Sequence, residues 1–288
     1  LRLVGSEMCI RDRCSSYLFL QAQDHLRFAS AFTDNLVLQQ KSRVKIWGYA
    51  PPRSTLQVLA SWSRKEKTVK ADTCGKWMIE LSTPAGSYQT YNLSIANTEQ
   101  TVVLKNICIG EVWFCSGQSN MEMIMRNDPQ WRLYVDNANE EIAVADYPGI
   151  RFMTVQRNES FTALDEVLTE GWQVCSPQTV GGLSAVGYYF AHKLLSSLDV
   201  PVGLVVDAYG GSPIQSWIPY AETLKPLYKA EHETLQEAVE KGKEKPEYNM
   251  LSSLYNAMVH PLIDYKIRGW LWSVSYTHLR AHETELHL

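Results

Sequence analysis

Short apolar runs of strand length fill the first third of the chain. They lie between Asn35 and Asn106, and turn residues separate them at 51–52, 72–75 and 84–86. The runs read NLVLQQ, RVKIWGYA, STLQVLASW, KTVKAD, GKWMIEL, YNLSIAN and TVVLKN. Several short strands with regular turns are typical of a small β-sandwich. We therefore predict a β-sandwich domain over residues 31–108, without an obvious catalytic cluster.

The pattern changes near Ile109, where apolar runs become continuous instead of alternating. IGEVWFCS, GIRFMTV and VPVGLVVDA are predicted strands, and a helix-like NMEMIMRN follows Ser119. Ser184 precedes AVGYYFAHKLLSSL, whose apolar residues recur at helical spacing, so we predict a helix capped by that serine. GWQVCSPQTV is loop-like. Strand, helix and strand in this rhythm predict βαβ units and a parallel sheet over residues 109–272.

The stretch from 220 to 250 is charged and mostly helical in pattern. A solvated surface helix explains it most simply, and a substrate lid is the alternative. The sequence then regains apolar character in LYNAMVHPLIDYKIRGWLW, whose IRGWLW segment is typical of a buried strand.

Composition narrows the classes of function. The 288 residues are 45% hydrophobic and 20% charged with a net charge of −4, and no basic stripe favours nucleic acid. No apolar run approaches the ~18 residues that a membrane span needs. The six cysteines form no CxxC pair, so neither zinc nor redox chemistry is indicated, and Cys108 and Cys115 are expected to be buried thiols. Aromatic residues suit either a core or a glycan-facing surface.

Both ends of the chain differ from the rest. Residues 1–13 and 273–288 resemble translated adapter sequence and are set aside, genuine termini being the alternative. Within 14–30, CSSYLFLQAQ resembles the end of a secretory signal peptide, or else a first strand or a disordered leader. His278, His282 and His287 fall in the excluded tail. The remaining histidines are His25, His192, His232 and His260.

Ser119 is the sharpest candidate for chemistry. It follows the apolar strand ending in Cys115-Ser116-Gly117, where a strand-to-helix turn exposes a hydroxyl, although most such serines merely cap helices. Gly210-Gly211 follows another predicted strand, and paired glycines let backbone N–H groups approach a ligand as an oxyanion hole requires. A tight turn is the alternative. Because carboxyl ends of parallel strands meet at one edge, both segments are expected in one crevice.

These stretches resemble a known family. GEVWFCSGQSNMEM is similar to the first motif of the sialate O-acetylesterases, a branch of the SGNH hydrolases, and GLVVDAYGGSPIQSWIP to their second. LYNAMVHPLIDYKIRGWLW resembles the approach to the third, and FTDNLVLQQ with VKIWGYA resembles the β domain that precedes the hydrolase in bacterial members. The resemblance spans about residues 31–272. It implies an α/β fold with an SGNH-type parallel sheet, incomplete at its C-terminal end.

The resemblance also implies roles. Ser119 would be the nucleophile, and the N–H groups of Ser119 and Gly211, beside Gly210, would form the oxyanion hole. Gln118 and Asn120 would shape the turn. The expected substrate is an O-acetylated sialic acid or related glycan, outside the cytoplasm of a bacterium, with no metal or organic cofactor. The alternatives are an acetylxylan-type esterase and a non-catalytic glycan-binding protein.

The chain departs from the family pattern after Trp272. The Tyr-Gln-Gly-Glu-Ser-like element is absent, and no Asp-x-x-His pair occurs. We therefore expect the catalytic base to be missing and hydrolysis of an aryl acetate by this chain to be near background. His260 is expected to pack or lie at the surface, His192 has no carboxylate at useful spacing, and His232 is expected to be solvated.

Overall fold

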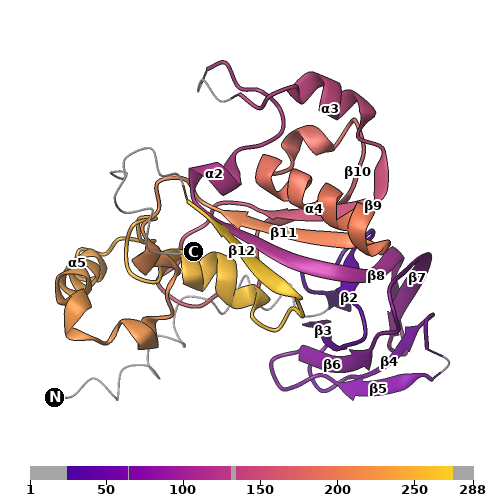
Figure 1. Cartoon of the computed structure of the whole chain (residues 1–288). Helices are drawn as coiled ribbons and strands as arrows, with labels where there is room; N and C mark the ends of the chain where they lie inside the picture. The colour runs from indigo at the N-terminus through magenta and orange to yellow at the C-terminus, as the bar shows by residue number, and fades with distance from the viewer. Residues whose placement is uncertain (1–24, 64, 131–133, 275–288) are drawn as a thin grey trace.

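Two layers of mainly antiparallel strands form the N-terminal part of the protein (Figure 1). The computed structural model describes residues 25–63, 65–130 and 134–274. A small sheet has the order β1–β3–β6, formed by Arg27–Phe28, Arg43–Tyr49 and Lys76–Ser82. The second layer contains β2 (Val37–Gln39), β4 (Thr55–Ala60), β5 (Lys67–Lys70), β7 (Ser87–Ala96) and the start of β8 (Thr101–Gly117). Among the strands described there, only β2, which pairs with β8, is parallel to its neighbour. The predicted small antiparallel region is confirmed.

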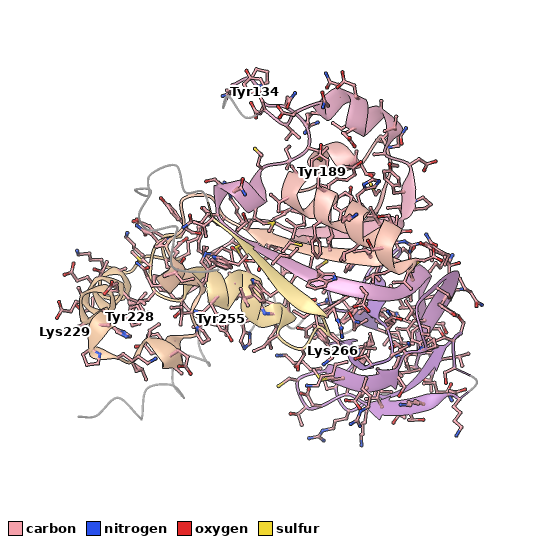
Figure 2. All side chains as sticks on the ribbon, in the orientation of Figure 1. Tyr134, Tyr189, Tyr228, Lys229, Tyr255 and Lys266 are labelled. Atoms are coloured by element: carbon pink, nitrogen blue, oxygen red, sulfur yellow. The ribbon has the colours of Figure 1, made fainter. Side chains whose placement is uncertain are left out.

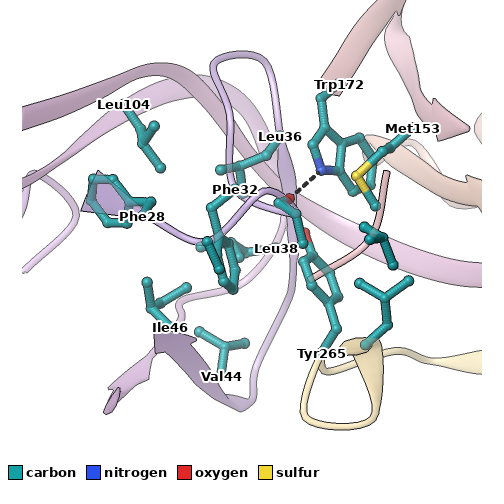
Figure 3. Close-up of a cluster of buried hydrophobic side chains, with 14 of the residues drawn as sticks. Phe28, Phe32, Leu36, Leu38, Val44, Ile46, Leu104, Met153, Trp172 and Tyr265 are labelled. Atoms are coloured by element: carbon teal, nitrogen blue, oxygen red, sulfur yellow. Dashed lines mark hydrogen bonds between the residues drawn. The ribbon is translucent and has the colours of Figure 1, made fainter. Parts of the chain in front are cut away.

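One hydrophobic core joins this region to the rest of the molecule. Val44 and Ile46 of β3 pack in the same cluster as Leu104 of β8 and Met153 of β9 (Figure 3). Two buried polar contacts cross the same cluster, because Trp172 Nε1 donates to Ala31 O at 3.0 Å and Tyr265 OH donates to Val37 O at 2.9 Å. The two parts are therefore joined by a shared hydrophobic core and by hydrogen bonds that cross it.

β8 runs without interruption from the antiparallel layer into a parallel sheet. Its second half pairs in parallel with β11 (Val202–Ala208) on one side and with β12 (Gly269–Ser273) on the other. β9 (Tyr147–Val155) extends the sheet in parallel beyond β11, and β10 (Thr169–Cys175) closes that edge antiparallel to β9. The predicted parallel α/β sheet is confirmed. The expected boundary at 108–109 falls inside β8.

The helices cover the parallel sheet unevenly. α4 (Ala185–Leu198) packs on it, and Ser184 Oγ accepts the N–H of Gly187 at 3.2 Å, as the sequence predicts for its cap. α2 covers only Ser119–Glu122, much less than the predicted helix, because Met123 leaves helical geometry at ψ 119° and Ile124 forms a β-bridge with Ser184. α3 (Ala138–Val144) lies on the same side (Figure 1).

The segment expected to be a loop at 171–180 is half strand. Trp172 to Cys175 pair with β9 as part of β10, and Trp172 is 3% exposed. The polar residues that suggested a loop occupy only the later part, where η1 (Val180–Gly182) forms. Burial of Trp172 against the core therefore outweighed the weak local pattern.

The charged stretch forms several short elements around one exposed helix. Two 3₁₀ turns, η3 (Tyr220–Thr223) and η4 (Pro226–Tyr228), lead into α5 (Lys229–Glu240). α5 lies away from the parallel sheet, and Figure 2 shows side chains such as Lys229 directed outward from it. η2 (Ile214–Trp217), η5 (Tyr255–Val259) and η6 (His260–Leu262) complete the described elements. The expectation of a solvated helix is confirmed for 229–240.

Some expectations lie partly or wholly outside the described residues. They concern residues 1–13, which resemble adapter sequence, most of residues 14–30, which resemble the end of a signal peptide, and residues 275–288. Ser273, the first residue of the segment set aside at the C-terminus, is the last residue of β12. Cys108 and Cys115 are buried free thiols, as expected, and Cys74 and Cys175 are also free.

Candidate active site

Ser119 lies at the carboxyl edge of the parallel sheet. β8 ends at Gly117, and α2 begins at Ser119, so the serine occupies the strand-to-helix turn that the sequence predicts. Its side chain is exposed, and its hydroxyl makes no hydrogen bond with the described part of the chain. Because the first N–H groups of a helix have no partner within the helix, the Ser119 N–H also points out of α2 unsatisfied by it.

Gly210 and Gly211 lie directly beside Ser119. A Cβ built on Gly210 would lie 2.9 Å from Ser119 Oγ, so a side chain larger than hydrogen would collide with the hydroxyl. Gly211 adopts φ +78°, and a Cβ there would meet no atom within 4 Å. The two predicted segments therefore share one crevice, and the Gly211 backbone faces open space within it.

Gln118 and Asn120 tie the serine turn to its neighbours. The Gln118 side-chain amide donates to Ser212 O, immediately after the glycine pair, and the Gln118 N–H donates to Ser273 O at 2.9 Å. Asn120 Nδ2 donates to Ser273 Oγ at 2.7 Å. The ends of β8, β11 and β12 are thus joined through the residues on either side of Ser119.

A carboxylate missed by the sequence analysis completes this arrangement. Glu122 Oε2 accepts the Gly210 N–H at 2.8 Å, and the same side chain forms a two-point ion pair with Arg157, at 2.6 Å to Nε and 2.6 Å to Nη2. The Gly210 N–H is therefore engaged by Glu122, whereas the N–H groups of Ser119 and Gly211 bond no acceptor in the described part of the chain. The bond to Glu122 is the main reason that the pKa of Arg157 is raised.

Arg157 links Glu122 to an aromatic and charged cluster. Its guanidinium lies 4.4 Å from the ring centre of Tyr209, whose hydroxyl donates to Glu159 Oε1 at 3.0 Å. Lys245 bonds the other oxygen of Glu159 at 3.0 Å, and Tyr248 stacks on Tyr209 at 5.1 Å. Ser119-x-x-Glu122 spacing places both residues on one side of a helical turn, which is a usable sequence signal. Nothing local marks Arg157.

Two buried polar groups lie beneath the turn without partners. Asp207 of β11 is 0% exposed, and neither of its carboxylate oxygens bonds to a described residue. It lies opposite Ser116 of β8, whose buried hydroxyl likewise has no partner there. Burial raises the pKa of Asp207 to about 8, because the charged form is poorly solvated in the sheet.

A cavity of about 340 Å³ opens at the carboxyl ends of β9 and β11. Glu122 and Arg157 line it, and the Glu122 carboxylate and the Ser119 hydroxyl both lie beside Gly210. Its other walls combine apolar and hydroxyl groups, from Ile124, Val155, Val206, Ala208, Thr154 and Ser184 among others. A concave space with apolar walls and a few polar groups is typical of small-molecule sites.

None of the histidines described in the structure bonds Ser119. His260 Nδ1 lies 3.0 Å from Leu164 O, consistent with the packing role expected for it, and the His192 ring on α4 lies 4.7 Å from the ring of Tyr147. The expectation for His232 was wrong. Its Nε2 lies 2.9 Å from Thr223 O and its ring packs edge-on to Tyr220, because the 3₁₀ turn of η3 folds back on α5.

Two further features bear on function. Within residues 25–63, 65–130 and 134–274, no group of three or more His, Cys, Asp or Glu side chains is arranged to hold a metal ion. No helix in those ranges combines the length and apolar character needed to cross a bilayer.

Comparison with known proteins places these features in context. A family model described as carbohydrate esterase, sialic acid-specific acetylesterase, matches residues 109–272. The sialate O-acetylesterase of Homo sapiens is 28% identical over 263 residues, covering 85% of this chain and 48% of that protein. The Mus musculus protein of the same name is 29% identical over 286 residues, covering 85% and 51%. The chain spans about half the length of these curated relatives.

A solved structure shows the same arrangement. A carbohydrate acetylesterase from Xanthomonas citri superimposes with a TM-score of 0.72 at 26% identity, covering 87% of this chain and 51% of that chain. The superposition extends over more than residues 109–272, so the antiparallel region is shared as well.

Proposed function

Since the chain belongs to the carbohydrate esterase family of sialic acid-specific acetylesterases, we propose that Ser119 is the nucleophile of a carbohydrate O-acetylesterase. The observation that carries this proposal is the exposed Ser119 hydroxyl beside the Gly210-Gly211 backbone, at the edge of the sheet where parallel strands end. The substrate is an O-acetylated sialic acid or a related acetylated glycan.

The reaction proceeds through an acetyl-enzyme. Ser119 Oγ attacks the acetyl carbonyl and gives its proton to a general base, and the N–H groups of Ser119 and Gly211 stabilise the oxyanion. Collapse of the tetrahedral intermediate breaks the bond to the sugar oxygen, which takes the proton back from the base. Water, deprotonated by the same base, then attacks the acetyl-serine and releases acetate and free Ser119.

Glu122 acts as a positioning residue in this scheme. By accepting the Gly210 N–H while it pairs with Arg157, it fixes the glycine turn relative to α2. Gln118 does the same from the other side through Ser212 O. The Gly211 N–H is thereby held beside Ser119, as preorganised stabilisation of an oxyanion requires. The cavity at Glu122 and Arg157 receives part of the substrate.

The general base lies outside the described residues. A small imidazole in solution can replace a missing histidine, so the chain can be assayed with and without it. We expect an aryl acetate to be hydrolysed near background without imidazole, and faster when imidazole is added. Ser119→Ala should remove the part of the added rate that depends on the protein and leave only the reaction of free imidazole with the ester.

Matched controls separate the roles in this assay. Ser116→Ala changes a buried serine three residues away and should keep the assisted rate within about threefold. An assisted rate that is equal in Ser119→Ala would overturn the assignment. Acetate release is then measured with acetylated sialic acid and, separately, with acetylated xylan. Faster release from the first supports the sialate substrate, and faster release from the second supports the plant-glycan alternative.

We place the protein outside the cytoplasm, in the periplasm or the medium of a bacterium. The support is the glycan substrate class and the CSSYLFLQAQ segment that resembles the end of a signal peptide. Fractionation of producing cells tests this, with cytoplasmic recovery as the contrary result.

A further inference from the structure

A second concave site lies away from Ser119, between the small sheet and the segment that precedes β12. It has a volume of about 390 Å³ and shares none of its lining residues with the cavity at Glu122 and Arg157. One wall is formed by β3 and β6, and the opposite wall by residues 260–264 with Leu164 and Asp165. We refer to this space as the sheet groove.

The wall formed by the sheet is largely aromatic and apolar. Trp47 pairs with Met78 and Tyr49 with Lys76 across the two strands, so these side chains emerge on the same face. Phe32 holds the Trp47 ring edge-on at 4.5 Å, and Met78 is 44% exposed. This wall therefore offers a fixed, partly exposed platform to a ligand with an apolar face.

Ion pairs fix the spacing of the two walls. Lys76 bonds Asp165 at 2.6 Å, and Lys45 of β3 bonds Asp264 at 2.5 Å. Each pair joins the sheet to the opposite wall and uses one oxygen of its aspartate. Exposed pairs of this kind contribute only about 0–1 kcal/mol to stability, so their clearer consequence is to hold the groove open at a set width.

The polar groups of the groove are mainly hydrogen-bond acceptors. Asp72, Asp165 and Asp264 line it, with Lys76 as the accompanying cation. His260 Nδ1 lies 3.0 Å from Leu164 O, and since a carbonyl only accepts, Nδ1 is the donor; in that neutral tautomer Nε2 is an acceptor. Trp77, 2% exposed, adds an indole N–H that has no partner in the described chain.

We propose that the sheet groove binds a neutral sugar unit of a glycan, independently of Ser119. A pyranose presents an apolar C–H face, which stacks on Trp47 and Met78, and several hydroxyl donors, which bond the aspartates and His260. The three carboxylates outnumber Lys76 and Lys45, the two lysines that pair with them, and this excess of negative charge disfavours an anionic sugar there. The inference needs only this chemistry and does not rest on the esterase reaction.

Binding is measured by calorimetry and tryptophan fluorescence on the chain carrying Ser119→Ala, so that no turnover interferes. The probes are xylohexaose and lactose as neutral sugars, free N-acetylneuraminic acid as an anionic sugar, and n-butylamine as a cation. We expect saturable binding of at least one neutral sugar, and weaker binding of the anion. Saturable binding confined to the anion or the amine, or no saturable binding of either neutral sugar at millimolar concentration, would overturn the proposal.

Two variants locate the binding. Trp47→Ala should weaken it about tenfold by removing the platform, and Asp264→Asn should weaken it by a smaller factor while keeping the shape of the wall. Glu80→Gln is the matched control, since Glu80 lies on β6 outside the groove and pairs with Arg43. Circular dichroism confirms folding of each variant. Neutral-sugar binding that survives both Trp47→Ala and Asp264→Asn unchanged would place the site elsewhere.

Discussion

The two halves of β8 belong to the same strand and yet follow different rules. From Thr101 to Ile107 exposed and buried positions interchange, whereas from Cys108 to Gly117 all positions except Trp113 are buried. The first half pairs antiparallel with β7 and has one face toward solvent. In the second half, Cys108–Gly110 pairs in parallel with β2, Glu111–Gly117 with β11 and Trp113–Gly117 with β12. An antiparallel sheet can leave one face exposed to solvent, whereas a parallel sheet has both faces covered by other elements.

The difference also explains the position of the proposed site. Parallel strands all end at one edge, so Ser119, Gly210 and Ser273 meet there although they come from distant parts of the chain. Antiparallel strands end at alternate edges and bring no such set together. We therefore expect substitutions of residues in β7 to alter stability alone, and substitutions at the carboxyl ends of the parallel strands to alter catalysis.

The largest expected effect is on stability, from Leu93→Ala in the antiparallel part. Leu93 is 0% exposed and lies opposite Leu104 of β8, so truncation leaves a cavity and should lower the free energy of unfolding by about 2–5 kcal/mol. Urea denaturation measures this. At low temperature, where the variant stays folded, its imidazole-assisted rate should match that of the unchanged chain. Loss of the imidazole-assisted rate in Leu93→Ala without loss of stability would contradict this division between the two parts of the molecule.

A smaller effect, now on catalysis, is expected from Glu122→Ala. The Gly210 turn loses its acceptor and Arg157 its partner, so the imidazole-assisted kcat should fall by about 10–100-fold with little change in KM. Glu122→Gln keeps an oxygen for the Gly210 N–H and should retain most of the rate. Glu80→Ala, which breaks an exposed pair with Arg43, is the control. Equal losses in the Gln and Ala variants would show that Glu122 does not act through Gly210.

A third effect, on the pH dependence of stability, is set by Asp207. Its folded pKa of about 8 lies above the ordinary aspartate value of about 3.9, so between those limits the unfolded chain has lost a proton that the folded chain keeps. Stability should therefore fall as pH rises through this window, by at most about 1.4 kcal/mol per pH unit. Asp207→Asn should remove that slope and Asp264→Asn should not. The measurement is urea denaturation at about pH 5 and about pH 7.5, and an unchanged slope in Asp207→Asn would contradict the account.

Much of the fold follows from local pattern. Continuous apolar runs indicated the parallel strands, and Ser184 marked the start of α4 because a hydroxyl there can bond an unsatisfied N–H. The shortness of α2 and the existence of strand β10 were not predicted, because each depends on a partner distant in sequence. Ile124 after α2 forms a bridge with Ser184, and Trp172 of β10 pairs with β9. Tertiary pairing decided both against a weak local signal.

The residues of the candidate site were likewise predicted only in part. Ser119 and the glycine pair were predicted together because the carboxyl ends of parallel strands must meet. The pairing of Glu122 with Arg157 was not, because the two residues are 35 positions apart and no local pattern connects them. Asp207 carried a signal that was overlooked, a single acid within the apolar run VGLVVDA, where a carboxyl must be buried.

The most direct test of the central claim is to find the acetyl group itself. The chain is incubated with an aryl acetate and limiting imidazole, quenched early, digested and mapped by mass spectrometry alongside Ser119→Ala. The account predicts one added acetyl group on the peptide that contains Ser119, and none on the corresponding peptide of the variant. Acetylation at another residue, or equal acetylation of both proteins, would contradict it.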